Sequence, residues 1–344
     1  MTKGKNAVSK RRQVLRIAAV MLAVALIIGP YIPAAEAAHV FAPHVDAAAN
    51  IDDELVYLDP NGAIRVLDPQ APADSSSVTW FSPTGGWRYV ALGDFNADGD
   101  MEIVAVGANE GIYRLTVFDP VVEGDDARRA DGMIGGIPWA ELYSVVLTGE
   151  PLVVGAGNFD LARPGDEIVY VYRLPPEEIV QNDDPFRYVV LSSDDDQPDG
   201  RTWSAIVTFD SGYPATWLEA GNLNGTGADE IAIINRSGGS LSVFTIIGST
   251  LERILYRAFN RLDWVDGAIG QFMAGGDEEL AAVRETVFPS PSLFVLQFAN
   301  GNWTDAYYEY NDPPPEAVWF ADISGNGDDE VVALRRVPVE LGNR

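Results

Sequence analysis

The chain contains no cysteine and only two histidines, His39 and His44, which lie close to its N-terminus. The absence of cysteine excludes disulfides, thiolate metal sites and a cysteine nucleophile. Both histidines precede nearly all of the repeated sequence described below. A Ser-His-Asp triad or a histidine-rich zinc site within the repeats is therefore also excluded. Stability must come from a buried core, which a chain of this length can supply without cross-links.

Lysine is absent after Lys10, and acidic residues outnumber basic ones by 51 to 23, which gives a formal net charge of −28. Such an acidic surface repels nucleic acid and anionic membranes, so we expect neither as a partner. It also attracts divalent cations. Adaptation to salt, or simple solubility, is the alternative explanation for the acidity.

Residues 1–38 have the organisation of a secretory signal peptide. Basic residues precede an uninterrupted apolar run over residues 17–28, and Ala35-Glu36-Ala37 supplies a small-residue cleavage site. The run is shorter than the about 20 apolar residues that a membrane span needs, so an uncleaved anchor is only the alternative. The pair Arg11-Arg12 also resembles a twin-arginine export signal. We expect residues 39–344 to be secreted or held at the cell surface, by the general secretory or the twin-arginine route.

Six turns rich in glycine and acidic residues each end in glutamate and lead into a β-branched apolar segment. The clearest is Gly93-Asp-Phe-Asn-Ala-Asp-Gly-Asp-Met-Glu102, which is followed by Ile-Val-Ala-Val. Neighbouring terminal glutamates are 48 to 65 residues apart, and a recurrence of about 50 residues indicates a repeat architecture. The terminal glutamates are Glu54, Glu102, Glu167, Glu230, Glu279 and Glu330.

The sequence between these turns predicts short strands. After Trp217 the expected strands are residues 217–220, 231–235, 241–247 and 251–258, separated by glycine, serine and asparagine. No segment after the leader shows a helical period. Four antiparallel strands at this interval predict a β-propeller blade, whose apolar face is buried by the next blade. Tandem β-sandwiches need about 100 residues per unit and do not fit.

We therefore predict an all-β protein, a β-propeller of about six four-stranded blades over residues 39–344, or of seven if the chain is truncated. The ends of the repeat region leave two alternatives open. Only 14 residues follow Glu330, too few to complete a blade. Either residues 39–46 supply a strand to the last blade, or the chain is a truncated form of something longer.

The spacing of oxygen-bearing residues in these turns suits a hard cation. Side chains at positions 1, 3 and 5 of a tight turn converge, a glycine at position 6 permits the reversal, and a later carboxylate completes the shell that Ca²⁺ requires. Two turns carry a full or nearly full set. These are Asp94, Asn96, Asp98, Asp100 and Glu102 in one, and Asp322, Ser324, Asn326, Asp328 and Glu330 in the other. An EF-hand is excluded because its closing glutamate stands at position 12 on a helix.

Other turns keep less of the pattern. The weaker candidate ligands are Asn158, Asp160 and Glu167, in a turn with a one-residue insertion, and Asn222, Asn224, Thr226 and Glu230, in a turn with one charge. The turn of Gln271, Met273, Gly275 and Glu279 is not expected to bind calcium because methionine offers no hard oxygen, and the Glu54 turn has lost its first half. We expect two calcium ions and at most four. The alternative for every turn is a plain hairpin, with glycine at positive φ and aspartate capping backbone amides.

The turns resemble the FG-GAP/VCBS repeats of integrin-α-like propellers, whose pattern is Asp-h-Asn-x-Asp-Gly-x-x-Glu before a strand. The resemblance covers most of residues 50–336. It implies a calcium-stabilised propeller of about seven blades, whereas this sequence shows six repeat starts. It also implies adhesion or ligand binding without naming a ligand.

We expect a monomeric, non-catalytic, calcium-binding module that binds an extracellular protein or glycan. One alternative is a glycan-active enzyme that uses paired carboxylates about 5–9.5 Å apart, and another is a purely structural surface scaffold. The tryptophans before the acidic turns are expected to pack between blades rather than to stack on sugars. Residues 303–310, with Tyr307, Tyr308 and Tyr310, are the better candidate for an exposed aromatic surface.

Overall fold

The computed structural model describes residues 55–67, 78–82, 84–97, 99, 101–109, 111–119, 140–179, 185–194, 202–258, 264–273, 277–285, 290–324 and 328–335. The predicted signal peptide, the expected strand at residues 39–46 and the turn that ends at Glu54 lie outside these residues. The regular secondary structure of the described residues is β-strand, apart from one short 3-10 turn at Pro176–Glu178. No helix in the described part is long and apolar enough to cross a bilayer.

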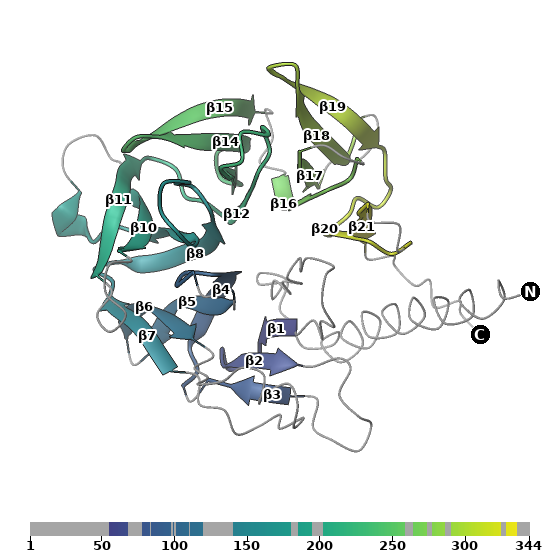
Figure 1. Ribbon diagram of the computed structural model, residues 1–344. Helices are drawn as coiled ribbons and strands as arrows, with labels where there is room; N and C mark the ends of the chain where they lie inside the picture. The colour runs from purple at the N-terminus through teal and green to yellow at the C-terminus, as the bar shows by residue number, and fades with distance from the viewer. Residues whose placement is uncertain are drawn as a thin grey trace, which may run out of the picture. The chain divides into compact units, whose positions relative to one another are not determined.

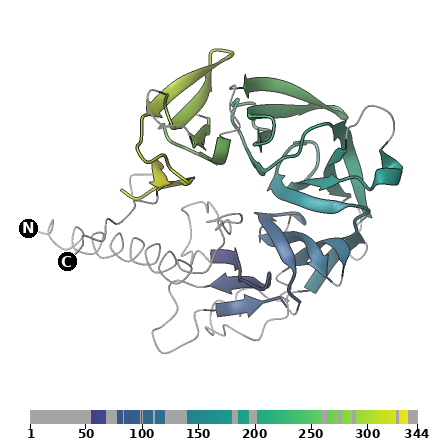
Figure 2. The same cartoon turned by 180° about the vertical axis from the view of Figure 1, so that it is seen from behind.

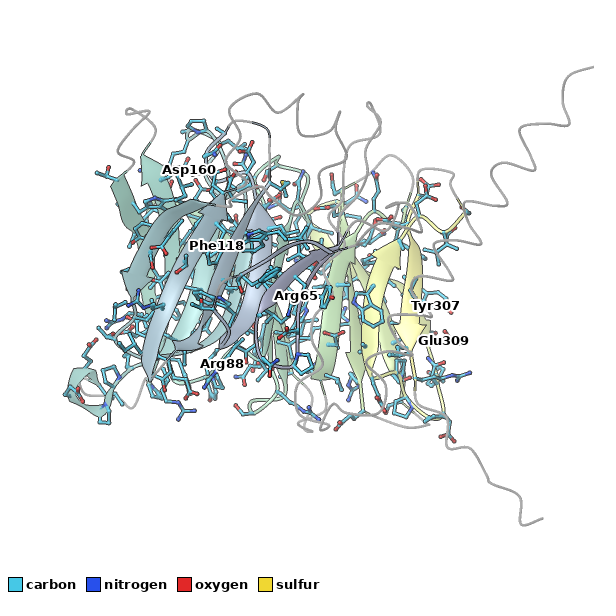
Figure 3. All side chains as sticks on the ribbon, turned by 90° about the horizontal axis from the view of Figure 1, so that it is seen from below. Arg65, Arg88, Phe118, Asp160, Tyr307 and Glu309 are labelled. Carbon is cyan, nitrogen blue, oxygen red and sulfur yellow. The ribbon has the colours of Figure 1, made fainter. Side chains whose placement is uncertain are left out.

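The chain divides into two compact units, which are considered separately. The first comprises residues 1–85, 122–137 and 322–328, and the second comprises the remainder. The first unit contains a three-stranded antiparallel sheet of β1 (Leu55–Leu58), β2 (Ile64–Leu67) and β3 (Val78–Phe81). Ile64 and Val66 are buried in this sheet, and Arg65 pairs with Asp59 at 2.7 Å beside the turn between β1 and β2 (Figure 3).

The second unit contains four four-stranded antiparallel sheets, in each of which the strands pair in chain order. Their strands are β4 (Trp87–Gly93), β5 (Glu102–Asn109), β6 (Ile112–Asp119) and β7 (Ala140–Val146); β8 (Glu150–Gly157), β9 (Glu167–Arg173), β10 (Phe186–Asp194) and β11 (Thr202–Ser211); β12 (Trp217–Gly221), β13 (Glu230–Asn235), β14 (Ser240–Ile247) and β15 (Thr250–Ala258); and β16 (Trp264–Gly270), β17 (Glu279–Arg284), β18 (Leu293–Ala299) and β19 (Asn302–Glu309). A two-stranded sheet of β20 (Ala317–Ala321) and β21 (Glu330–Leu334) follows.

The strands expected after Trp217 are confirmed to within one or two residues as β12 to β15. Six sheets correspond to the six repeat starts. The first and the last sheets differ from the expected four strands, because the described residues supply three and two strands to them.

The first strand of each sheet in the second unit lies against the first strand of the next sheet. The neighbouring pairs are β4 and β8, β8 and β12, β12 and β16, and β16 and β20 (Figures 1 and 2). Small residues on these strands admit large side chains from the neighbouring sheet. A Cβ at Gly267 on β16, for example, would lie 2.8 Å from the indole of Trp217 on β12.

Apolar runs form the second strand of each four-stranded sheet and are largely buried on both faces. In β13 the residues from Glu230 to Asn235 are all buried, and β17 shows the same pattern. Each large aliphatic side chain buried in this way contributes about 1.5–3 kcal/mol to folding. Trp217 and Trp264 are also buried in the cluster that joins neighbouring sheets, so the packing predicted for these two tryptophans is confirmed. The outer strands β15 and β19 are largely exposed.

Candidate functional site

The acidic turns of the second unit all connect the first strand of a sheet to its second strand. They therefore share one end of the sheets. Figure 3 shows Asp160, from the turn between β8 and β9, at this end, and Arg88 of β4 toward the opposite end. Loops gathered at one end of a rigid scaffold are a common place for binding sites.

In four turns of the second unit, the terminal glutamate accepts hydrogen bonds from the turn's own backbone. Glu102 is buried, and its Oε2 accepts the amide N–H groups of Phe95 at 2.7 Å and Asn96 at 3.2 Å. The same pair of amides, at positions 2 and 3, bonds the glutamate of the other turns: Phe159 and Asp160 to Glu167, Leu223 and Asn224 to Glu230, and Phe272 and Met273 to Glu279. The glutamate thus fixes the start of the turn.

This anchoring is independent of the predicted calcium ligands. Glu279 bonds the amides of Phe272 and Met273 at 2.8 and 3.2 Å, although the Met273 turn lacks the hard oxygens of the other turns. The closing glutamate therefore has a structural role in every described turn of this unit, whether or not an ion binds. The participation of Glu102, Glu167 and Glu230 in calcium binding stays a prediction.

In four turns, the acidic residue just before the terminal glutamate joins the turn to the turn of the preceding sheet. Asp229 Oδ2 accepts the amide N–H of Asn158 at 2.8 Å, and the amide of Asp229 donates to the carbonyl of Asn158 at 2.8 Å. We call this pair of hydrogen bonds the inter-sheet bridge. It recurs between Asp166 and Asp94, Asp229 and Asn158, Glu278 and Asn222, and Asp329 and Gln271.

Sequence analysis missed the inter-sheet bridge. Its signal is the acidic pair before the strand, as in Asp229-Glu230, and the glycine that ends the first strand of the preceding sheet. A Cβ at Gly157 would stand 2.8 Å from Asp229 Oδ2, so the close approach of the carboxylate requires glycine there. The second repeat has Met101 in place of the acid and offers no such acceptor.

Burial raises the pKa of several of these carboxyl groups. The pKa of Glu167 and that of Glu230 rise to about 7, and the pKa of Asp229 rises to about 6, in each case chiefly because burial disfavours the charged form. The backbone amide bonds described above act in the opposite direction and stabilise the ionised form. Burial likewise raises the pKa of Asp166 and of Glu279.

The predicted ligands at the first position curl into their turns. Asp94 Oδ2 accepts the amide N–H of Gly99 at 3.1 Å, five residues further on, while Ala97 and Gly99 have φ of 58° and 93°. Asn222 Oδ1 accepts the amide of Gly227 in the same way at 3.3 Å. Both turns are therefore closed by a bond from the first-position side chain to the backbone five residues further on. A carboxylate has a second oxygen and several lone pairs, so Asp94 can accept this amide and still bind a cation.

The third-repeat turn already contains a cationic side chain. Its insertion places Arg163 Nε 3.3 Å from Asp160 Oδ2, and Asp160 Oδ1 accepts the amide of Ala162 at 3.1 Å. An exposed ion pair of this kind is worth little energetically. It does put a guanidinium where a metal ion would compete for the same carboxylate.

The full set of predicted ligands is not brought together by the described residues. Within them, no group of three or more Asp, Glu, His or Cys side chains is placed to hold a metal ion. Asp98, Asp100 and Asn326 lie outside the described residues. In the last turn Asp322, Ser324 and Asp328 belong to the first unit and Glu330 to the second. The oxygen chemistry of the Asp94 turn and its closed backbone fit Ca²⁺.

Comparisons with known proteins identify structural relatives only. No protein-family model matches the chain, and no curated protein matches it significantly. The structure is similar to that of a rhamnogalacturonan lyase, YesW, with 14% identity, a TM-score of 0.46 and coverage of 87% of this chain. The chain spans 55% of the length of that lyase.

Two crystal structures of BBS1N in complex with ARL6DN are similar over more of their length. The lead-soaked crystal gives 9% identity, a TM-score of 0.53 and coverage of 88% of this chain and 77% of BBS1N. The mercury-soaked crystal gives 9% identity, a TM-score of 0.51 and coverage of 86% of this chain and 75% of BBS1N. With the sheet order of the second unit, these similarities confirm the predicted all-β, β-propeller fold. At such low identity they show the fold alone.

Proposed function

We propose that this chain is an exported, non-catalytic β-propeller whose acidic turns bind Ca²⁺ and hold one end of the sheets rigid for binding an extracellular partner. The observation that carries the proposal is the closed Asp94 turn, in which Gly99 donates its amide to the first-position carboxylate. Asp94 and Asn96 would hold the ion together with Asp98 and Asp100. The ion would supply positive charge where several carboxylates otherwise repel one another.

The inter-sheet bridges make the turns a connected row rather than independent loops. Because Asp166 bonds both the amide and the carbonyl of Asp94, a displacement of one turn disturbs the next. An ion that fixes the Asp94 turn would therefore stiffen its neighbour as well. A rigid row of turns reduces the ordering cost of binding, which favours a recognition role.

The position of the Glu167 and Glu230 carboxyl groups argues against the enzymatic alternative. The pKa of Glu167 and that of Glu230 are raised to about 7, as a general acid requires. Both groups are buried at the base of their turns, where they accept backbone amides, so a substrate would have to displace those bonds. Assays for reducing-sugar release from glycans are expected to show no turnover. Turnover abolished by one Asp or Glu substitution outside the turns would overturn the proposal.

A protein is the class of partner that the comparisons favour. BBS1N, which shares the fold with a TM-score of 0.53, was crystallised in complex with ARL6DN. The net charge of −28 disfavours nucleic acid and anionic membranes here. A glycan ligand is the other class, and a glycan array probed with the calcium-loaded protein distinguishes the two.

The calcium site is tested by thermal unfolding of the purified protein with Ca²⁺, with Mg²⁺ and with a chelator. We expect Ca²⁺ alone to raise the midpoint, since an ion at ten times its Kd stabilises the fold by about 1.4 kcal/mol. Asp94→Ala should remove much of this gain.

Gln271→Ala is the matched control, because Gln271 holds the first position of the turn in which methionine occupies the third position and calcium is not expected. It should leave the calcium-dependent gain intact. Equal midpoints in Ca²⁺ and chelator, or equal effects of Mg²⁺ and Ca²⁺, would contradict the proposal.

A further inference from the structure

Among the described strands, β19 lies at the edge of its sheet, beyond β18, and exposed tyrosines stand at its C-terminal end and directly after it. The exposed fractions are 41% for Tyr307, 54% for Tyr308 and 49% for Tyr310. The amide of Ser292 donates to the carbonyl of Glu309 at 2.9 Å, so the backbone of Glu309 faces β18. Backbone groups alternate in direction along a strand, so those of Tyr308 point to the outer edge, where another extended chain can pair.

The tyrosines occupy both faces of this edge. Tyr308 and Tyr310, two residues apart, form an edge-to-face pair with ring centroids 5.9 Å apart and an interplanar angle of 87°. Tyr307 projects with Glu309, as Figure 3 shows, and its hydroxyl donates to Glu309 Oε2 at 3.2 Å. Its ring lies 6.4 Å from that of Phe272. Glu309 is thus held in place beside the outer edge.

The charge of this edge has a single sign. Residues 302–316 include Asp305, Glu309, Asp312 and Glu316 and contain no arginine or lysine. Asp305 binds a guanidinium already, because Arg257 of β15 lies 2.6 Å from its Oδ1. The neighbouring outer strand β15 carries Arg253 and Arg257, so the uniform negative charge of β19 and the segment after it is not shared by β15.

We propose that the outer edge of β19, from Tyr307 to Tyr310, together with Asp312, docks an extended basic segment of a partner protein. The partner backbone would pair with the outward groups of Tyr308. Its alternating arginine or lysine side chains would lie on the face of Tyr308 and Tyr310, over the two rings and toward Asp312. This rests on the proposed role as a protein-binding module and names the surface and the partner chemistry.

Other occupants fit the edge less well. A second copy would bring another acidic edge against this one, and like charges on paired strands repel. Nucleic acid is repelled for the same reason. A sugar chain needs a flat aromatic platform, whereas the rings of Tyr308 and Tyr310 are nearly perpendicular. Pairing would stop at Pro313, which has no amide hydrogen.

The test is a fluorescence-anisotropy titration of the full chain with a short labelled peptide in which arginine and valine alternate. A peptide of the same length with glutamate in place of arginine should not bind. The double variant Tyr308→Ala/Tyr310→Ala is expected to weaken arginine-peptide binding by about ten-fold. Tyr213→Ala and Tyr256→Ala are matched controls, because these tyrosines are also exposed, at 62% and 53%, and lie on other parts of the surface. These two variants should bind the arginine peptide as tightly as the unmodified chain does.

A single variant, Tyr308→Ala, keeps the test valid if the double variant does not fold, and circular dichroism establishes folding for each. Equal loss in the Tyr213 and Tyr256 controls, or no loss in the Tyr308 variants, would overturn the proposal, because binding would then follow from overall acidity. Self-association at the edge, or glycan binding lost on Tyr308→Ala, would also overturn it. Binding of another protein that survives Tyr308→Ala would overturn the surface assignment and leave the proposed function intact.

Discussion

At the scale of single residues, the inter-sheet bridge is the contact with the clearest energetic consequence. Asp229 stands at the end of one turn, yet its carboxylate bonds the amide of Asn158 in the turn of the preceding sheet at 2.8 Å. Asp229 and Glu230 are neighbours in sequence but serve different partners. Glu230 bonds amides of its own turn, so adjacent acids of similar chemistry stabilise the turn and the junction between sheets separately.

Replacing Asp229 by alanine should destabilise the fold by about 1–3 kcal/mol, because the partly buried amide of Asn158 then loses its acceptor. Asp229→Asn retains an acceptor oxygen and should cost less. Urea unfolding midpoints measure both. Glu252→Ala, on the exposed strand β15, is the control and should change stability little. An alanine variant no less stable than the control would show that the bridge contributes nothing.

At the scale of elements, the acidic turns combine buried carboxyl groups with a short, closed backbone. The sequence predicted where these turns lie and which strands they join, because glycine, asparagine and the β-branched run after each glutamate are local signals. It did not predict that Glu102 and Glu230 would bond amides at positions 2 and 3. The spacing from amide to carboxylate is set by the loop conformation, which depends on packing against neighbouring sheets.

The turns should make stability depend on pH when no divalent ion is present. The pKa of Glu230 rises from 4.5 to about 7 in the folded state, so the folded protein retains a proton that the unfolded chain has lost in this interval. The contribution is complete below about pH 4.5 and is lost as the pH rises to about 7. Because of Glu230, the free energy of unfolding, measured in chelator at pH 4.5 to 8, should therefore decrease as the pH rises.

Glu230→Gln removes the titration and should make the decline shallower. Glu252→Gln serves as a control because Glu252 lies on the exposed strand β15. If both variants leave the pH profile unchanged, the carboxyl group of Glu230 does not carry a raised pKa.

At the scale of the whole molecule, charge is the dominant feature. A net charge of −28 means that compaction brings many like charges together. Raising NaCl in chelator from about 0.01 to 0.15 M shortens the Debye length from about 30 to about 8 Å. We expect the thermal midpoint to rise with NaCl, by an amount that is the same for the unmodified chain and for Asp94→Ala. A midpoint that stays flat or falls would mean that self-repulsion is not a significant term.

The sequence alone determined the repeat, the all-β class and the position of every described acidic turn, because these follow from glycine placement, residue order and strand periodicity within short segments. It also indicated that Tyr307, Tyr308 and Tyr310 form an exposed aromatic surface. Only the tertiary structure decided which carboxylates join neighbouring sheets and that β19 is an edge. Those facts depend on contacts such as that of Asp229 with Asn158, between residues 71 positions apart, which come together only when successive sheets pack.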